Sequence, residues 1–333
     1  MTITRLSVDP PLVPVGHIDV SVLVPAKDEA GNLPAFMEEA EAAFADTGIA
    51  FEVVVIDDGS RDDTWPVLGA LAARYPFLRR VQHRRQRGIA DALRTGSLHA
   101  RGEVLVFYPA DLQYRPEDIP RLVRPILAGE FDMVTGYKQG KYDKAFVSRV
   151  YNWLSRTLFD VPVRDLNSVK AYRREIMDAI PVRPDWHRYM IVIAAAEGYT
   201  VTEIPVPLYP RREGKSKFAG RGRIAIGVLD MLSVWFELRF GRKPLLLFGV
   251  LGVLLFGVGT LTGIVALLVR FVIPPYQGFR PLLNLIEVCL ILGFLSFATG
   301  LLGEQIAVLR AELRELRRES GPGAGDESPS RDR

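Results

Sequence analysis

The chain has 333 residues, of which 48% are hydrophobic and 24% charged, and its net charge is +3. This composition excludes a disordered chain, a collagen and a coiled-coil rod as descriptions of the whole protein. A single cysteine excludes an internal disulfide framework and a cysteine-based zinc site. The net charge is too small to indicate a nucleic-acid partner, and the length allows roughly two domains.

Residues 1–17 contain prolines but no apolar run long enough for an export signal, so we expect a flexible segment followed by a cytosolic domain. From 18 to 206, short apolar runs alternate with amphipathic segments. The pattern predicts helices between strands at 19–24, 51–56, 79–82, 104–108 and 131–134. It is typical of a Rossmann-like, mainly parallel α/β sheet with helices on both faces. No G-x-G-x-x-G follows the first strand, which argues against a dinucleotide-binding domain.

Residues 244–302 predict a transmembrane hairpin. The run 245–269 has no charged residue and 282–302 has only Glu287, and each is long enough to span a bilayer. Lys and Arg are dense before and after the hairpin but sparse in its loop, so the positive-inside rule places both chain ends in the cytosol. We therefore expect a two-helix protein of the inner (plasma) membrane.

Three shorter segments border the hairpin. Residues 219–243 predict an amphipathic interfacial helix on the lipid bilayer, 303–319 a charged cytosolic helix, and 320–333 a disordered tail. Apolar residues of the charged helix have heptad-like spacing: Ile306, Leu309, Leu313 and Leu316. A homo-oligomer could form through the hairpin and this helix. However, the run is shorter than the three or four heptads typical of a coiled coil, which favours a solvated helix.

Acidic residues follow three of the predicted strands. They are Asp28 and Glu29 after the first strand, Asp57 and Asp58 after the second, and Asp111 after the fourth. Each one alone is typical of a turn or a helix cap. Because the carboxyl ends of parallel strands meet at the edge where ligands bind, the three sets together predict a binding crevice.

Three motifs in these loops resemble family 2 glycosyltransferases with the GT-A fold: V-P-A-K-D-E-A-G-N, V-V-I-D-D-G-S-R-D-D-T and P-A-D-L-Q-Y-R-P-E-D-I-P. Later stretches at 166–176, 186–190 and 211–218, with the predicted hairpin, resemble the polyprenyl-phosphate glycosyltransferases. That group includes dolichyl-phosphate-mannose synthase and bacterial polyisoprenyl-phosphate glucosyltransferase. The resemblance covers residues 18–302 and implies a GT-A catalytic domain at 18–218.

The resemblance implies a role for each motif. Family residues that hold the donor nucleotide match Pro25, Ala26, Asp28, Glu29, Asp57, Asp58, Gly88 and Arg94. The metal motif D-x-D-x-Q matches at Asp111 and Gln113, which implies Mg²⁺ or Mn²⁺ bound together with the donor diphosphate. Asp111 is therefore the expected catalytic residue.

The sequence departs from the family pattern at two places. Pro109 stands where the metal motif has its first Asp, and proline has no carboxylate. One ligand must then come from elsewhere, or the metal is held more weakly. Lys27-Asp28-Glu29 stands where family members often have an aromatic residue and Asn-Glu, which would alter nucleotide recognition.

A basic, glycine-containing loop lies between the predicted catalytic domain and the interfacial helix. Its Arg211, Arg212, Ser216 and Lys217 are suited to bind the phosphate of a lipid acceptor that rises from the bilayer. Lys138, after the fifth strand, would add positive charge. A patch for anionic lipid headgroups is the alternative interpretation.

The resemblance implies transfer of a sugar, with inversion, from a nucleotide-sugar to a polyprenyl phosphate on the cytosolic face of the membrane. Three alternatives stay open: a processive polysaccharide synthase, a catalytically decayed membrane scaffold, and a transferase with a non-lipid acceptor. The lack of a Q-x-x-R-W motif argues against the first, and the retained acidic residues and basic loop argue against the second. A water-soluble acceptor that is used as well as the lipid would favour the third.

Overall fold

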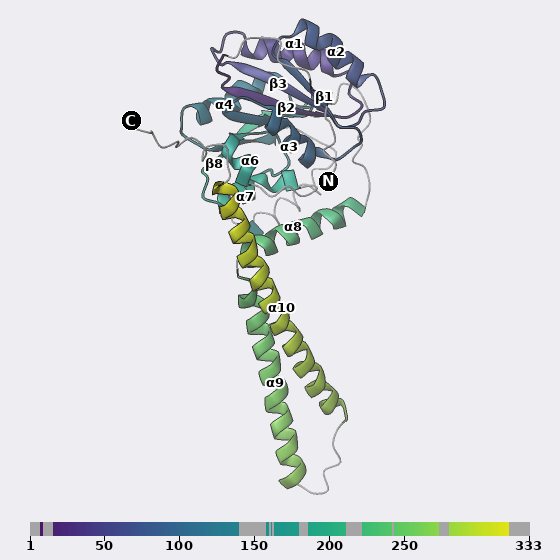
Figure 1. Ribbon diagram of the computed structural model, residues 1–333, viewed down its shortest axis with the longest axis vertical. Helices are drawn as coiled ribbons and strands as arrows, with labels where there is room; N and C mark the ends of the chain where they lie inside the picture. The colour runs from purple at the N-terminus through teal and green to yellow at the C-terminus, as the bar shows by residue number, and fades with distance from the viewer. Residues whose placement is uncertain are drawn as a thin grey trace, which may run out of the picture. The chain divides into compact units, whose positions relative to one another are not determined.

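The computed structural model describes residues 7–8, 16–139, 158–159, 161, 163–179, 186–210, 222–241, 243–272 and 280–319. The chain divides into two compact units, Met1–Leu232 and Ser233–Arg333. The first unit holds a sheet with its helices, and the second holds two long apolar helices (Figure 1). The basic residues predicted at 211–217 lie outside the described residues.

The first unit is built on an eight-stranded sheet with the order β1-β4-β3-β2-β5-β7-β6-β8. The strands are β1 (Ser7–Val8), β2 (Val20–Ala26), β3 (Phe51–Asp57), β4 (Leu78–Gln82), β5 (Val104–Phe107), β6 (Met133–Gln139), β7 (Lys170–Arg173) and β8 (Val201–Pro207). β2 is parallel to β3 and β5, β3 to β4, and β6 to β8. The expected mainly parallel sheet is confirmed, but β7 runs antiparallel between β5 and β6.

Helices cover both faces of this sheet (Figure 1). They are α1 (Leu33–Phe44), α2 (Thr64–Arg74), α3 (Ile89–His99), η1 (Pro116–Asp118), α4 (Ile119–Leu127), α6 (Arg174–Ala179), η2 (Trp186–Tyr189) and α7 (Met190–Ala196). α1, α2 and α4 pack on one face, where alternate strand residues such as Val22, Val53 and Val106 form the main core. On the other face α3 lies so close to the sheet that a Cβ at Gly96 would be 2.8 Å from Ile56 Cδ1.

The strand order creates a switch point between β2 and β5. From β2 the chain adds β3 and β4 on one side, and β5 then pairs with the other side of β2. In open parallel sheets, ligands bind outside the carboxyl ends of the strands at such a point. The loops 27–31 and 108–114 leave β2 and β5 there, so the topology alone indicates these loops as parts of a ligand site.

The second unit contains the apolar helices. α8 (Gly222–Phe240) runs from the end of the first unit into the second. α9 (Pro244–Val272) and α10 (Arg280–Glu319) are long and apolar enough to cross a membrane, by length and composition. α10 continues without a break past Leu302, so the charged segment 303–319 belongs to the same helix as the second apolar run.

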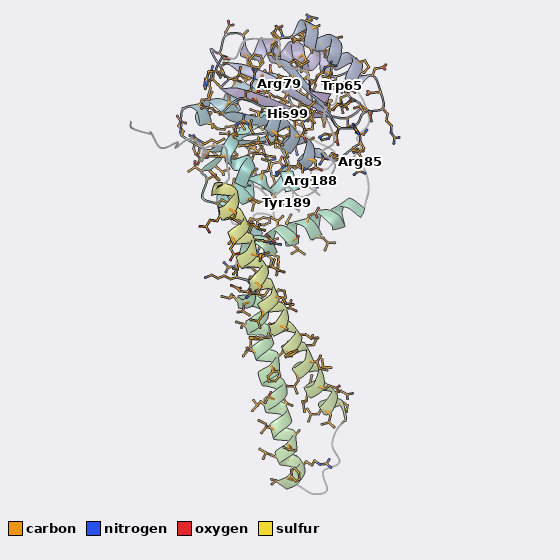
Figure 2. All side chains as sticks on the ribbon, viewed as in Figure 1. Trp65, Arg79, Arg85, His99, Arg188 and Tyr189 are labelled. Atoms are coloured by element: carbon orange, nitrogen blue, oxygen red, sulfur yellow. The ribbon has the colours of Figure 1, made fainter. Side chains whose placement is uncertain are left out.

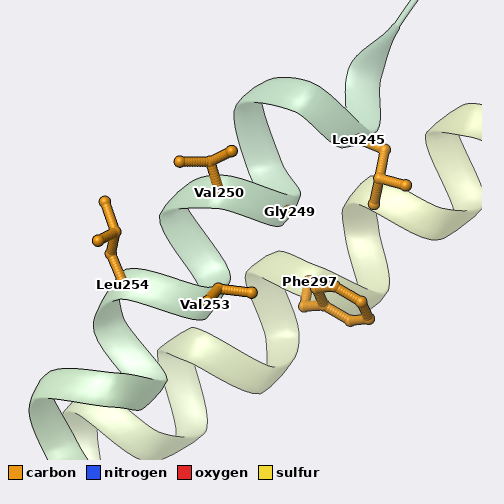
Figure 3. A pocket seen from close by; sticks show the side chains of 6 residues that line it. All are labelled: Leu245, Gly249, Val250, Val253, Leu254 and Phe297. Carbon is orange, nitrogen blue, oxygen red and sulfur yellow. The ribbon is translucent and has the colours of Figure 1, made fainter.

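Glycines bring α9 and α10 into close contact. A Cβ at Gly252 would lie 2.7 Å from the Gly293 carbonyl oxygen, and one at Gly293 would lie 2.6 Å from the Phe256 nitrogen. Small residues let membrane helices approach in this way. Ser296 Oγ also donates to the Phe248 carbonyl at 3.0 Å. A pocket of about 330 Å³ lies beside this contact and is lined by apolar residues, namely Leu245, Gly249, Val250, Val253, Leu254 and Phe297 (Figure 3).

Candidate active site

Hydrogen bonds join the loops that follow β2 and β3. Asp28 has a φ of +50°; it donates its N–H to Ser60 Oγ (2.8 Å) and accepts the Arg61 N–H on Oδ1 (2.7 Å). The Glu29 N–H donates to Thr64 Oγ1 (2.9 Å). A positive φ is tolerated by Asp because its short polar side chain can bond locally. The two loops therefore form a single bonded group at the edge of the sheet.

Asp57 positions the turn that follows β3. Its side chain is fully buried; Oδ1 accepts the Ser60 N–H at 2.8 Å, and Oδ2 accepts a hydrogen bond from Gln82 Nε2 at 2.9 Å. Both carboxylate oxygens thus have partners within the protein, one in the turn and one on β4. The geometry gives Asp57 the role of shaping the loop.

Asp58 binds the loop between β4 and α3. Its Oδ1 accepts hydrogen bonds from His83 Nδ1 and the Arg87 N–H, and its Oδ2 accepts the Gly88 N–H, each at 2.8 Å. His83 Nε2 lies 2.9 Å from Thr95 Oγ1 on α3. Burial raises the pKa of the Asp58 carboxyl, but the bonds from His83, Arg87 and Gly88 outweigh this, and the pKa lies below its usual value. An ionised Asp58 only accepts, so Nδ1 of His83 carries the proton.

The same loop also touches the β3 turn through its backbone. Gly59 has a φ of +69°, and a Cβ there would lie 2.7 Å from the Arg85 carbonyl carbon, so only glycine fits. Arg85 is exposed on this loop (Figure 2), and Arg94 is exposed farther along α3. Gly88 precedes α3 with a φ of +96°. The structure thus brings Gly88 to the acidic loops, whereas Arg94 has no described contact with them.

The loop after β5 carries Asp111 and Gln113, which are both partly exposed. Asp111 Oδ1 accepts the Gln113 N–H at 3.2 Å, and the buried Leu112 between them has a φ of +53°. A carboxylate and an amide carbonyl are hard oxygen donors that suit Mg²⁺ and Mn²⁺. Within the described ranges, no three His, Cys, Asp or Glu side chains gather as a metal site.

Contacts from two other elements fix this loop. The Tyr209 N–H, after β8, donates to the Gln113 carbonyl at 2.9 Å, and the Arg115 guanidinium lies 4.2 Å from the centroid of the Tyr209 ring. Before β7, Ser168 Oγ donates to the Tyr114 hydroxyl at 3.3 Å. The loop is therefore held between the start of β7 and the end of β8.

β7 begins with a lysine that has no exposed surface. Lys170 pairs with Phe107 at the end of β5, and its Nζ donates to the Ser168 carbonyl at 2.7 Å. Burial lowers the pKa of Lys170 to about 7, against the opposing attraction of Asp165. Asp165 is also paired with Lys138, whose Nζ lies 3.2 Å from its Oδ2. The predicted phosphate ligand Lys138 thus already has a carboxylate partner.

A buried histidine lies beside this lysine. The His187 ring packs edge-on against Phe107 with 6.2 Å between centroids, and its Nδ1 has no hydrogen-bond partner among the described residues. Burial, followed by the charges of Lys170 and Arg188, lowers the pKa of His187 to about 3. Lys170 and His187 lie in the stretches 166–176 and 186–190 that carry the family resemblance, but nothing in the spacing of these residues or of Asp165 signals burial beside the end of β5.

We expect Lys170→Met to raise the melting temperature at pH 7. An unfolded lysine has a pKa of 10.5, so from pH 10.5 down to about 7 the unfolded chain binds a proton that the native protein does not. Native stability therefore rises with pH across this window, and the full cost of burying the charge is present below it. Methionine removes that cost, and each kcal/mol gained should add roughly 2–4 °C. The melting temperature should rise between pH 7 and 10 in the wild type only. An equal rise in both proteins would contradict the lowered pKa of Lys170.

Apart from Arg94, the predicted donor residues lie in bonded loops at the ends of β2 and β3 and before α3. Pro25 and Ala26 end β2, and the Ala26 carbonyl accepts the Asp58 N–H at 2.8 Å. Four predicted acceptor residues lie outside the described residues: Arg211, Arg212, Ser216 and Lys217. The described geometry therefore defines one bonded group of loops after β2, β3 and β4, and a separate Asp111 loop after β5.

The first unit of the chain matches a known protein family, and two known proteins are similar to most of the chain. Residues 21–180 match the family described as Glycosyl transferase family 2, a segment that includes both acidic loops and Asp111. The matched segment is a domain of this family type. The glycosyltransferase is 29% identical to dodecaprenyl-phosphate galacturonate synthase from Rhizobium johnstonii, over 88% of this chain and 89% of that protein. It is 28% identical to undecaprenyl-phosphate 4-deoxy-4-formamido-L-arabinose transferase from Pseudomonas fluorescens, over 89% and 87%.

The fold of the glycosyltransferase is similar to that of a solved enzyme. Glucosyl-3-phosphoglycerate synthase from Mycobacterium tuberculosis, crystallised with Mn²⁺, uridine diphosphate and glucosyl-3-phosphoglycerate, matches with a TM-score of 0.54 and 21% identity. The match covers 66% of this chain and 80% of that chain. At this identity the likeness establishes the GT-A type of fold.

Proposed function

We propose that this glycosyltransferase transfers a sugar from a nucleoside-diphosphate sugar to the phosphate of a polyprenyl phosphate, with inversion at the anomeric carbon. An acceptor phosphate oxygen forms a bond to that carbon, and the bond to the diphosphate breaks with its electron pair leaving on the nucleoside diphosphate. The acceptor phosphate is largely ionised near neutral pH, so no general base is needed to remove a proton from it. Positioning and charge neutralisation should therefore contribute most of the rate enhancement.

One observation carries this proposal: the similarity to polyprenyl-phosphate glycosyltransferases extends over 88% of the chain and 89% of the relative. A match of that length includes the apolar hairpin as well as the catalytic domain. A transferase with a water-soluble acceptor has no need for the hairpin. The shared architecture therefore favours an acceptor that is a membrane lipid. The catalytic domain would then lie on the cytosolic face of the inner membrane.

The bonded loops after β2 and β3 are suited to hold the donor nucleotide. Asp57 and Asp58 hold these loops in place through hydrogen bonds to their carboxylate oxygens, and the loops carry the residues predicted to contact the nucleotide. Asp111 and Gln113 would hold Mg²⁺ or Mn²⁺ together with the donor diphosphate. When bound, the cation would neutralise charge on the departing diphosphate.

The basic segment predicted to bind the acceptor begins two residues after Tyr209, and Tyr209 is bonded to the Asp111 loop through Gln113. Arg211 and Arg212 therefore follow closely, along the chain, a residue that is bonded to the Asp111 loop. This chain connection supports the segment as the acceptor-phosphate site.

Turnover by the purified full-length protein tests the proposal. A panel of uridine and guanosine diphosphate sugars is offered with undecaprenyl or decaprenyl phosphate and Mg²⁺ or Mn²⁺, and lipid-soluble glycosylated product is measured by mass spectrometry. We expect a polyprenyl phosphate sugar for one donor. No turnover with any donor would favour the scaffold, and equal use of a water-soluble acceptor would favour the non-lipid alternative.

Pro109→Asp is expected to lower the metal concentration needed for half-maximal activity. The substitution restores a carboxylate two residues from Asp111, where hard cations gain from an added oxygen ligand. Activity is measured against Mg²⁺ and Mn²⁺ concentration. An unchanged half-maximal concentration would mean that the wild type already compensates for the missing ligand.

Arg212→Ala and Lys217→Ala are expected to weaken use of the acceptor roughly ten- to a hundredfold each, the scale of a charge-assisted bond to a phosphate. The affinity for the nucleotide-sugar should change little. Kinetics in neutral detergent micelles separate this role from attraction to anionic headgroups, since that attraction needs a charged surface. An unchanged acceptor kcat/KM in neutral micelles would rule out the phosphate contact.

A further inference from the structure

The loop that carries Asp111 alternates between buried and partly exposed residues. Every second residue is at most 6% exposed and belongs to the main core of the first unit, namely Tyr108, Ala110, Leu112 and Tyr114. The residues between them are partly exposed, namely Pro109, Asp111 and Gln113. The core therefore fixes every second residue of the loop, and both expected metal ligands lie among the residues between them.

Leu112 has an unfavourable backbone conformation between these two ligands. Its φ is +53°, in the left-handed region, where the Cβ of an L-residue comes too close to the following carbonyl oxygen. Such a conformation persists only where the surrounding structure overdetermines it. A rotation of Leu112 to an ordinary φ would change the directions of the carboxylate before it and of the amide after it. The orientation of the ligands therefore depends on what holds the loop.

A buried hydroxyl closes the base of this loop. The Tyr108 hydroxyl donates to the Arg115 carbonyl at 2.6 Å, so it joins the residue before the loop to the residue after it. The Tyr108 side chain has no exposed surface, and its ring lies edge-on to the Tyr114 ring with 6.3 Å between centroids. The Phe36 ring of α1 also lies 6.3 Å from it. Packing therefore fixes the ring that carries the hydroxyl.

We propose that Tyr108 is a positioning residue for the cation of the donor diphosphate. Its bond to Arg115 keeps Leu112 in the left-handed conformation, and the expected ligands on either side of Leu112 thereby keep one fixed orientation. The inference rests on the proposed function, since it takes these two side chains as ligands of Mg²⁺ or Mn²⁺. Pro109 increases the need for positioning, because it supplies no carboxylate. Fewer ligands bind well only if they are fixed before the cation arrives.

Tyr108→Phe isolates the hydroxyl. Phenylalanine keeps the buried ring, and the bonds that Ser168 and Tyr209 make with the loop do not involve Tyr108, so the protein should fold. Tyr172→Phe is the matched control. Tyr172 lies on β7 and is equally buried, and its hydroxyl lies 3.9 Å from Met177 Sδ, outside the loop.

Hydrogen exchange measures release of the loop in the purified full-length protein without any ligand. Peptides that cover residues 109–114 are followed by mass spectrometry. We expect exchange in Tyr108→Phe to be roughly threefold faster or more, the scale of losing one hydrogen bond, and unchanged in Tyr172→Phe. An unchanged rate in Tyr108→Phe would mean that the hydroxyl does not hold the loop, and it would overturn the inference.

Mn²⁺ binding measures the consequence for the ligands. Free Mn²⁺ is followed by electron paramagnetic resonance while it is titrated into protein that contains uridine diphosphate or, separately, guanosine diphosphate. The dissociation constant should rise roughly three- to tenfold in Tyr108→Phe and stay unchanged in Tyr172→Phe. Equal Mn²⁺ binding by the two variants would overturn the positioning role, and a wild type that binds no Mn²⁺ would overturn it together with the metal role of Asp111.

Neither measurement uses the acceptor lipid or detects product. A protein that forms no polyprenyl phosphate sugar would contradict the proposed function, yet it would still show the expected differences between Tyr108→Phe and Tyr172→Phe if the hydroxyl positions the ligands. The two failures are therefore distinguishable.

Discussion

Replacing Asp111 by Asn is expected to lower turnover by roughly two to three orders of magnitude, the scale of losing a major electrostatic contact at a reacting centre. The amide has nearly the same shape as the carboxyl. The loop is held by Tyr209 and Ser168 through contacts that do not involve the Asp111 side chain, so the fold should be unaffected. Turnover at saturating donor, together with a melting curve, separates loss of activity from loss of folding.

Glu117→Gln is the matched control for this variant. Glu117 is an exposed carboxylate a few residues farther along the same segment, and its substitution should leave turnover unchanged. Near-normal activity of Asp111→Asn would mean that this carboxylate contacts neither the diphosphate nor its metal. The catalytic assignment would then be wrong.

Asp58→Asn is expected to reduce the free energy of unfolding by about 3 kcal/mol, the scale of losing buried hydrogen bonds to a charged group. Asn keeps one acceptor oxygen, but its NH₂ group must then face one of three hydrogen-bond donors: the buried His83 Nδ1, the Arg87 N–H or the Gly88 N–H. The loop 83–88 then loses the carboxylate that holds it, so binding of the nucleotide-sugar should weaken as well. Thermal unfolding in detergent and titration with nucleoside diphosphates measure the two effects.

The acid dependence of stability provides the check on this variant. The pKa of Asp58 is 3.8 in the unfolded chain and lower in the native protein, so its stabilisation is complete above about pH 4 and is lost as pH falls through the native pKa. Asp58→Asn should remove this part of the acid dependence. Asp63→Asn, at an exposed carboxylate in the same loop, should change neither property. Equal melting temperatures for the two variants would contradict the anchoring role.

Acidic residues that look alike in the sequence have different roles in the structure. Asp57 and Asp58 are buried and bonded within the protein, so they shape the donor loops. Asp111 is partly exposed in a loop that is held by other residues. This difference explains why we expect Asp58→Asn to act first on stability and Asp111→Asn on turnover.

The sequence by itself determined the order of strands and helices from β2 to β6, the two apolar helices and the strand ends where acidic residues gather, whereas β1, β7 and β8 were not predicted. These features follow from local patterns: apolar periodicity defines each element, and turn residues such as Gly59 mark where a strand ends. Chain order and parallel pairing then place the carboxyl ends of strands at a shared edge. The resemblance to the glycosyltransferase motifs likewise rests only on which residues follow one another in the chain.

Only the tertiary structure decided which partners the polar groups have. Asp58 is bonded to His83, which is 25 residues away, and Lys170 is buried because β7 inserts antiparallel beside Phe107. Hydrogen bonds and burial join residues that are distant in the chain, whereas sequence patterns report on near neighbours. For this physical reason, the sequence predicts where the site lies but not which partners its polar side chains have.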